Sequence, residues 1–176
     1  MIFNVAQLLK EAVGATRTYE LHEEADLLPD VPAIAPYAGS VRLVRLNQSV
    51  LVTAQVDTRV RLSCSRCLGT VEQPLHIEFT EEFRPTIDIA TGSTLPTPED
   101  QDTFVIDERH TLDLTEAVRQ YALINLPLVA LCREDCAGLC PVCGQDLNVG
   151  RCECQKEAGD PRLAALAELL AASERS

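Results

Sequence analysis

VLVTAQVDTRVRL, residues 50–62, alternates apolar and polar side chains over its whole length. Successive side chains of a β-strand point to opposite faces, so a period of two separates a buried face from a solvated one. We therefore expect a half-buried strand of an antiparallel sheet. Its buried face would carry Val50, Val52, Ala54, Val56, Thr58, Val60 and Leu62, and its outer face Thr53, Gln55, Asp57, Arg59 and Arg61.

A second alternating run follows at residues 75–84, with one polar interruption at Glu81. The segment SCSRCLGTVEQP, residues 63–74, joins the two runs. The two runs are therefore expected to form a β-hairpin with Cys64 and Cys67 at its turn. The apolar positions of the second run are Leu75, Ile77, Phe79 and Phe83.

The other periodic segments are shorter. Residues 16–22 and 41–46 predict two more strands. Asp113 followed by Glu116 is typical of a capping box, and the apolar spacing after it predicts a helix that ends before Pro127. These elements predict an α+β fold in which a capping helix covers an antiparallel sheet, either open or barrel-like.

Three segments are expected along the chain. Residues 1–131 form the β-rich domain, with an exposed loop at about residues 85–102, where Pro, Thr, Gly and acidic residues show no period. Residues 132–155 form a cysteine-rich zinc-binding segment, or zinc knuckle. Residues 156–176 predict an amphipathic C-terminal helix, which packs either on this domain or on a partner. Its apolar stripe consists of Leu163, Leu166, Leu169 and Leu170.

The composition restricts the class of protein. A chain of 176 residues, 46% of them hydrophobic, can bury one core without covalent cross-links. No segment approaches the ~20 apolar residues of a membrane span, and residues 1–24 show no basic leader before an apolar run, so we expect a soluble, cytoplasmic protein. The formal net charge of −12 argues against nonspecific binding to nucleic acid or to anionic lipid.

The charges are also segregated along the chain. Residues 41–68 carry five arginines and one acid, whereas residues 72–116 carry twelve acids and two arginines. The charges either lie on solvated outer faces or, for the arginine-rich segment, form a surface for an anionic partner. The five arginines are Arg42, Arg45, Arg59, Arg61 and Arg66.

The eight cysteines divide into four pairs, two of them with the spacing Cys-x-x-Cys. Structural zinc takes four thiolate or imidazole ligands in a tetrahedron, and a Cys-x-x-Cys turn supplies two of them. A turn at residues 148–150 returns the chain toward the later Cys-x-x-Cys, so we expect the last two cysteines to complete that site. The prediction is two structural zinc ions per chain, one held by Cys64, Cys67, Cys132 and Cys136, and one by Cys140, Cys143, Cys152 and Cys154.

An iron–sulfur cluster and redox dithiols are the alternatives, since Cys-x-x-Cys pairs serve both. Disulfides are disfavoured in a reducing compartment. The three histidines, His22, His76 and His110, lie far from the cysteine-rich segment in the sequence, and no catalytic base is evident near it. We therefore expect no catalytic residues.

The order of these features resembles the YceD family, known as the large ribosomal RNA subunit accumulation protein. The resemblance covers nearly the whole chain. It rests on the alternating strands, CSRC at residues 64–67, the acidic spacer, LPLVALC at residues 126–132 and, most specifically, DCAGLCPVCGQDLN at residues 135–148. It implies a bacterial or plastid protein needed for the accumulation of large-subunit ribosomal RNA, with no established enzymatic activity.

The resulting hypothesis is a non-catalytic ribosome-assembly factor. Its partner is a basic large-subunit ribosomal protein or precursor large-subunit rRNA, and the acidic composition favours the protein, because RNA binding requires neutralised phosphates. For an anionic partner, the candidate binding residues are Arg59, Arg61 and Arg66, because they approach the Cys64–Cys67 turn. The alternative is a thiol-redox or nucleic-acid-processing enzyme that uses the cysteine cluster.

Overall fold

The structure is a computed structural model that describes residues 1–96 and 103–154. Within these residues, seven strands form one sheet in the order β1-β7-β6-β5-β4-β3-β2. All neighbouring strands are antiparallel except β5 and β6. The elements are β1 (Ile2–Asn4), α1 (Ala6–Lys10), β2 (Thr16–Glu23), the 3₁₀ helix η1 (Ala25–Leu27), β3 (Tyr37–Arg45), β4 (Val50–Ser63), β5 (Thr70–Pro85), β6 (Val105–Ile106), β7 (Thr111–Asp113) and α2 (Thr115–Asn125).

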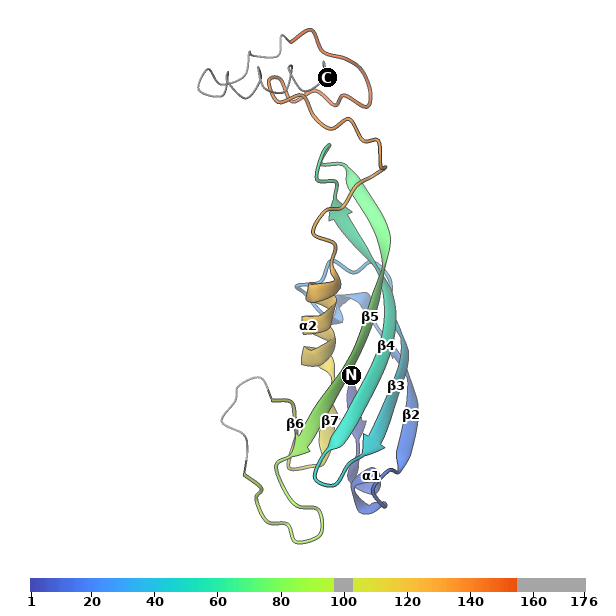
Figure 1. Cartoon of the computed structure of the whole chain (residues 1–176), viewed down its shortest axis with the longest axis vertical. Coiled ribbons are helices and arrows are strands. Elements are labelled where there is room, and N and C mark those ends of the chain that lie inside the picture. The colour runs from blue at the N-terminus through green and yellow to red at the C-terminus, as the bar shows by residue number, and fades with distance from the viewer. Residues whose placement is uncertain (97–102, 155–176) are drawn as a thin grey trace, which may run out of the picture.

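The sheet is curled into a half-barrel, and α2 lies against its concave side (Figure 1). The hairpin of β4 and β5 extends beyond the rest of the sheet, and the cysteine-rich segment lies at its far end (Figure 1). The predicted α+β fold with a mostly antiparallel sheet and a capping helix is therefore confirmed.

The β4–β5 hairpin is the longest paired region, with fourteen residue pairs from Val50↔Phe83 to Ser63↔Thr70. The predicted alternation of β4 is confirmed, since its even-numbered residues from 50 to 60 are buried. Thr58 belongs to this buried set, and its hydroxyl donates a hydrogen bond to the carbonyl oxygen of Ala35 at 2.7 Å. That bond removes the cost of burying an unpaired polar group.

The polar interruption at Glu81 has a specific partner on α2. The hydroxyl of Tyr121 donates to the carboxylate of Glu81 at 2.5 Å, and the ring of Tyr121 stacks on Phe79 with 4.8 Å between centroids. An aromatic pair of this kind adds about 0.5–1.5 kcal/mol beyond its buried area. The buried face of the helix consists of Ala117, Val118 and Ala122.

The start of α2 differs from the prediction. The helix begins at Thr115, because Asp113 ends β7 and its carboxylate accepts a hydrogen bond from the Thr115 amide at 2.9 Å. Glu116 pairs with Arg119 and Gln120, and these partners lower the pKa of Glu116 to about 2. The expected reciprocal capping box is therefore wrong, although the helix itself is confirmed.

Two predictions fall wholly or partly outside the described residues. These are the C-terminal helix at residues 156–176 and, within the exposed loop, residues 97–102. In the part of the chain that the structure covers, no helix has the length and apolar character needed to cross a membrane.

Candidate metal centres and the arginine surface

The turn of the β4–β5 hairpin, residues 64–69, is called here the first knuckle. The amide of Cys64 donates to the carbonyl of Gly69 at 2.7 Å, and the amide of Leu68 donates to the carbonyl of Cys64 at 2.9 Å. Closing so tight a turn places Leu68 at a φ of 58°, in the left-handed region that favours glycine. The turn brings Cys64 and Cys67 to the same side of the hairpin tip.

Residues 140–145 form a second knuckle with the same backbone bonds. The amide of Cys140 donates to the carbonyl of Gln145 at 2.8 Å, and the amide of Gly144 donates to the carbonyl of Cys140 at 2.9 Å. Gly144, at a φ of 74°, occupies the position equivalent to Leu68. The two knuckles therefore repeat one local geometry in different parts of the chain.

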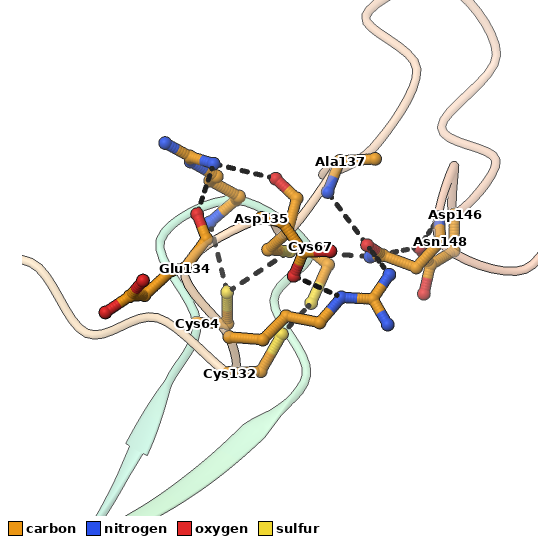
Figure 2. Close-up of polar contacts among 11 residues, drawn as sticks. Cys64, Cys67, Cys132, Glu134, Asp135, Ala137, Asp146 and Asn148 are labelled. Atoms are coloured by element: carbon orange, nitrogen blue, oxygen red, sulfur yellow. Dashed lines mark hydrogen bonds and ion pairs between the residues drawn. The ribbon is translucent and has the colours of Figure 1, made fainter.

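The first cluster of sulfurs joins the hairpin tip to the chain after α2. The Sγ atoms of its four cysteines lie within 4.8 Å of one another. Two of the separations are 3.8 Å, between Cys64 and Cys136, and 3.7 Å, between Cys67 and Cys132. A disulfide requires about 2.05 Å, whereas a tetrahedron with metal–sulfur bonds of about 2.3 Å has edges of about 3.8 Å. Figure 2 shows the sulfurs of Cys64, Cys67 and Cys132 converging.

The second cluster forms within the cysteine-rich segment itself. The Sγ atoms of Cys140, Cys143, Cys152 and Cys154 also lie within 4.8 Å of one another. Both groups of four cysteines thus have the membership expected from the sequence, and all eight cysteines are free of disulfides. Each group could hold one metal ion.

Backbone amides favour the thiolate form of the first cysteine in each knuckle. The amide of Cys67, followed by that of Arg66, lowers the pKa of Cys64 to about 6. The equivalent amides, those of Cys143 and Val142, lower the pKa of Cys140 to about 6. Because a metal binds thiolate rather than thiol, these two sulfurs are prepared for metal binding by the turn alone.

The cysteines that complete each cluster behave oppositely. The hydrogen bond between the thiol of Cys132 and the sulfur of Cys136 raises the pKa of Cys132 to about 12. The hydrogen bond to Cys143 likewise raises the pKa of Cys154 to about 12. The pKa values of Cys67 and Cys152 are raised as well, so each cluster keeps protonated thiols whose protons a bound metal ion would displace.

Arg66 fastens the first knuckle to the loop after α2. Its guanidinium donates to the carbonyl oxygens of Glu134, at 3.3 Å, and Cys136, at 2.9 Å. Its own carbonyl accepts from the amide of Leu139 at 3.1 Å. Gly138 has a φ of 75°, and a Cβ atom there would lie 3.0 Å from that carbonyl oxygen, so only glycine fits this crossing without a shift.

Asn148 links the two clusters, and sequence reasoning identified it only as a turn residue. Its side-chain oxygen accepts from the amide of Ala137 at 2.8 Å and from the guanidinium of Arg133 at 2.7 Å. Its side-chain nitrogen donates to Asp146 at 2.7 Å and to the sulfur of Cys136 at 3.4 Å. Figure 2 shows Asn148 between Ala137 and Asp146. A residue of the second cluster's loop thus supports a ligand of the first.

The three candidate partner-binding arginines have different environments. All three are exposed, but Arg61 pairs across the hairpin with Glu72 at 2.8 Å and Arg66 makes the loop contacts described above. Arg59 makes no ion pair with any described residue. Arg45 is half-buried, and its guanidinium donates to the carbonyl oxygen of Ser49 at 3.2 Å, whereas Arg42 is exposed.

Comparisons with known proteins agree with the sequence pattern. The family described as "Large ribosomal RNA subunit accumulation protein YceD" matches residues 52–170. An uncharacterized protein of Mycobacterium tuberculosis is 37% identical over 132 residues, which cover 74% of this chain and 60% of that protein. The uncharacterized protein YlbN of Bacillus subtilis is 30% identical over 178 residues, covering 99% of this chain and 98% of YlbN.

A plant relative carries the family's functional name. The chloroplastic "Large ribosomal RNA subunit accumulation protein YCED homolog 1" of Arabidopsis thaliana is 26% identical over 152 residues, covering 74% of this chain and 47% of the relative. The chain therefore spans about half the length of the plant relative and 60% of the mycobacterial one. No solved structure matches the chain.

Proposed function

The chain belongs to the YceD family, and we propose that it is a non-catalytic ribosome-assembly factor of the cytoplasm. In this proposal it supports the accumulation of large-subunit ribosomal RNA by binding a basic large-subunit ribosomal protein. The family and the name of the plant relative suggest the ribosomal role. The net negative charge of the chain supports a basic partner.

We assign zinc to both cysteine clusters, in a structural role. The chemistry of the donors supports this assignment, because each cluster offers four sulfurs in close contact, and a four-sulfur set selects zinc or iron–sulfur chemistry. Four protein ligands complete a tetrahedral zinc ion and leave no position for water or substrate, unlike a catalytic zinc site. Zinc bound in the first cluster would hold the hairpin tip to the segment after α2.

The single observation that carries the choice of partner is the distribution of charge. The chain has a net charge of −12, and residues 72–116 contain twelve acids against two arginines. On the outer face of β5, Glu72, Glu78 and Glu82 are all exposed. A surface of this sign attracts cationic proteins and repels phosphates.

Precursor rRNA is the second candidate partner, and the exposure of Arg59 without an ion pair among the described residues favours it. Only a limited cationic surface remains for phosphates, because Arg61 and Arg66 already contact Glu72 and two carbonyl groups. Affinity for RNA grows with the number of phosphates neutralised, so two or three arginines give weak binding at physiological salt.

Affinity capture from extract, with and without RNase, tests this proposal. We expect large-subunit ribosomal proteins to remain bound after RNase, and binding of the purified partner to weaken as the salt concentration rises. A matched pair of variants separates the candidates. Arg59→Glu should leave capture unchanged, whereas Glu78→Lys combined with Glu82→Lys should reduce it. Capture that disappears with RNase, and is lost in Arg59→Glu, would assign the role to RNA instead.

A further inference from the structure

Among residues 1–96 and 103–154, nothing pairs with the outer edge of β5 over most of its length. β5 pairs with β4 from Thr70 to Phe83, but with β6 only at Arg84 and Pro85. Toward β6, the amides of Arg84 and Thr86 donate to Phe104 and Ile106, at 3.0 and 3.1 Å. Backbone groups of successive strand residues point alternately to the two sides, so the other even-numbered residues of β5 also direct their backbone groups to this edge.

A row of backbone donors therefore faces away from the sheet. The amides of His76, Glu78, Thr80 and Glu82 have no backbone acceptor among the described residues. They span about 20 Å at the rise of an extended strand. Pro74, which has no amide to donate, closes the row at the end near the first knuckle.

A groove and exposed apolar side chains accompany this edge. α2 lies alongside β5, as the contact of Tyr121 with Glu81 and Figure 1 both show. At the end near β6, the groove has a volume of about 400 Å³, and Phe83, Phe104 and Gln120 are among its lining residues. Further along the helix, Ile124 is 75% exposed. A strand edge beside a helix, with apolar positions between them, is an arrangement that accepts an extended peptide.

The side chains along the edge determine which peptide fits. The side chains of Glu78 and Glu82 are exposed, and the amides of these two residues face the open edge. Glu116 lines the groove. Charged side chains of this kind also discourage edge-to-edge association between copies of one acidic chain. They do not discourage a cationic strand, whose lysine or arginine side chains would lie opposite the glutamates.

We propose that the β5 edge from His76 to Glu82 is the docking site for an extended, basic segment of the partner, which adds a strand to the sheet beside α2. This inference deepens the proposed function and rests on it for the identity of the partner, but not for the chemistry of the site. Backbone hydrogen bonds supply the pairing, the glutamates select lysine or arginine, and Phe83 and Phe104 in the groove favour apolar residues between the basic ones.

Amide hydrogen exchange of the full chain gives a direct test. The probe is a 12-residue peptide of alternating lysine and valine, and the control replaces each lysine with glutamate. With the lysine peptide we expect the exchange of the His76, Glu78, Thr80 and Glu82 amides to slow at least tenfold, while odd-numbered amides of β5, already bonded to β4, change little. Absence of selective protection overturns the proposal.

A pair of variants at Thr80 tests the same site by affinity. Thr80→Pro removes an edge-facing amide without breaking a bond to β4, and Thr80→Ala keeps the amide. Both lose the Thr53–Thr80 hydroxyl contact of 3.3 Å. We expect Thr80→Pro to weaken the Kd for the lysine peptide at least tenfold and Thr80→Ala less than twofold. Equal affinities in the two variants overturn the proposal. If the captured ribosomal protein binds without protecting these amides, only this inference fails; if the peptide docks but no ribosomal protein is captured, only the proposed function fails.

Discussion

The two cysteine knuckles have the same backbone turn but very different surroundings. The first closes a hairpin of fourteen residue pairs, and two of its cluster's cysteines, Cys64 and Cys136, are 0% and 2% exposed. The second lies in residues 140–154, outside the named strands and helices, and Cys140 is the one buried cysteine of its cluster. The comparison shows that one ligand turn can either fasten a sheet to a distant segment or fold a short loop. What a metal stabilises depends on the chain attached to the turn.

Removal of one ligand from each knuckle should give the largest difference between them. Cys64→Ser should release one zinc ion and lower the Tm by roughly 10 °C or more, since loss of a structural metal is among the largest effects and 1 kcal/mol corresponds to about 2–4 °C at this size. Cys140→Ser should release the other ion and lower the Tm by only a few degrees. Metal analysis and thermal unfolding measure both results.

Two results would contradict these expectations. Equal losses of Tm would mean that the second cluster stabilises the sheet as much as the first. A wild-type protein that contains one metal ion, or iron with its visible absorbance, would contradict the assignment of two zinc ions.

Features of the fold that depend on local spacing could be predicted from the sequence, whereas those that depend on distant contacts could not. The alternation of β4 and the grouping of cysteines depend on local spacing, so both were accessible before the structure. β1 and β7 are three residues each and pair across more than 100 positions, as Ile2↔Asp113 shows, and so short a strand has no detectable period.

The contacts of Asn148 and Arg66 were inaccessible for a related reason. Each is a polar residue in a turn whose role depends on a carbonyl, amide or sulfur of a different segment. The sequence suggested Arg66 as a binding residue for an anionic partner. In the structure its guanidinium donates to the carbonyl oxygens of Glu134 and Cys136. The sequence does show a glycine at position 138, the residue type that favours the positive φ found at the crossing with Arg66.

Asn148→Ala tests how far the first cluster depends on the loop of the second. The variant removes the donor to Cys136 and leaves the amide of Ala137 without its acceptor. We expect the affinity of the first cluster for zinc to fall about 10–100-fold, as for other residues that support a metal ligand, while both ions still bind at saturation. Competition with a chromogenic chelator measures this affinity.

Asn148→Asp is the matched control, because it keeps an acceptor for Ala137 but replaces the amide donor with a negative charge beside a thiolate. It should weaken the first cluster at least as much as Asn148→Ala. An affinity equal to that of the wild type in both variants would mean that the contact with Cys136 has no effect on metal binding.

The order of metal loss gives a smaller difference. Each cluster has one exposed cysteine, but two cysteines are buried in the first cluster and only Cys140 is buried in the second, so a chelator reaches the second cluster more easily. Excess chelator should therefore remove zinc in two phases whose rates differ about tenfold, an expectation based on the low exposure of closed core sites. Cys140→Ser should abolish the fast phase. Loss of the slow phase in that variant would reverse the assignment.

The smallest expected effect concerns the residue that differs between the two turns. Leu68 has a φ of 58° and is 68% exposed, whereas Gly144 occupies the equivalent position at 74°. A left-handed conformation costs a non-glycine residue about 1–2 kcal/mol, and the freedom that glycine gains in the unfolded chain offsets part of the benefit. Leu68→Gly should therefore stabilise the protein by about 0.5–1 kcal/mol, measured by denaturant unfolding of the zinc-loaded chain. Leu68→Ala removes nearly the same exposed side chain but keeps the Cβ, so it should bring no gain. Equal stability of the glycine and alanine variants would show that the two knuckles differ in strain less than their backbone angles indicate.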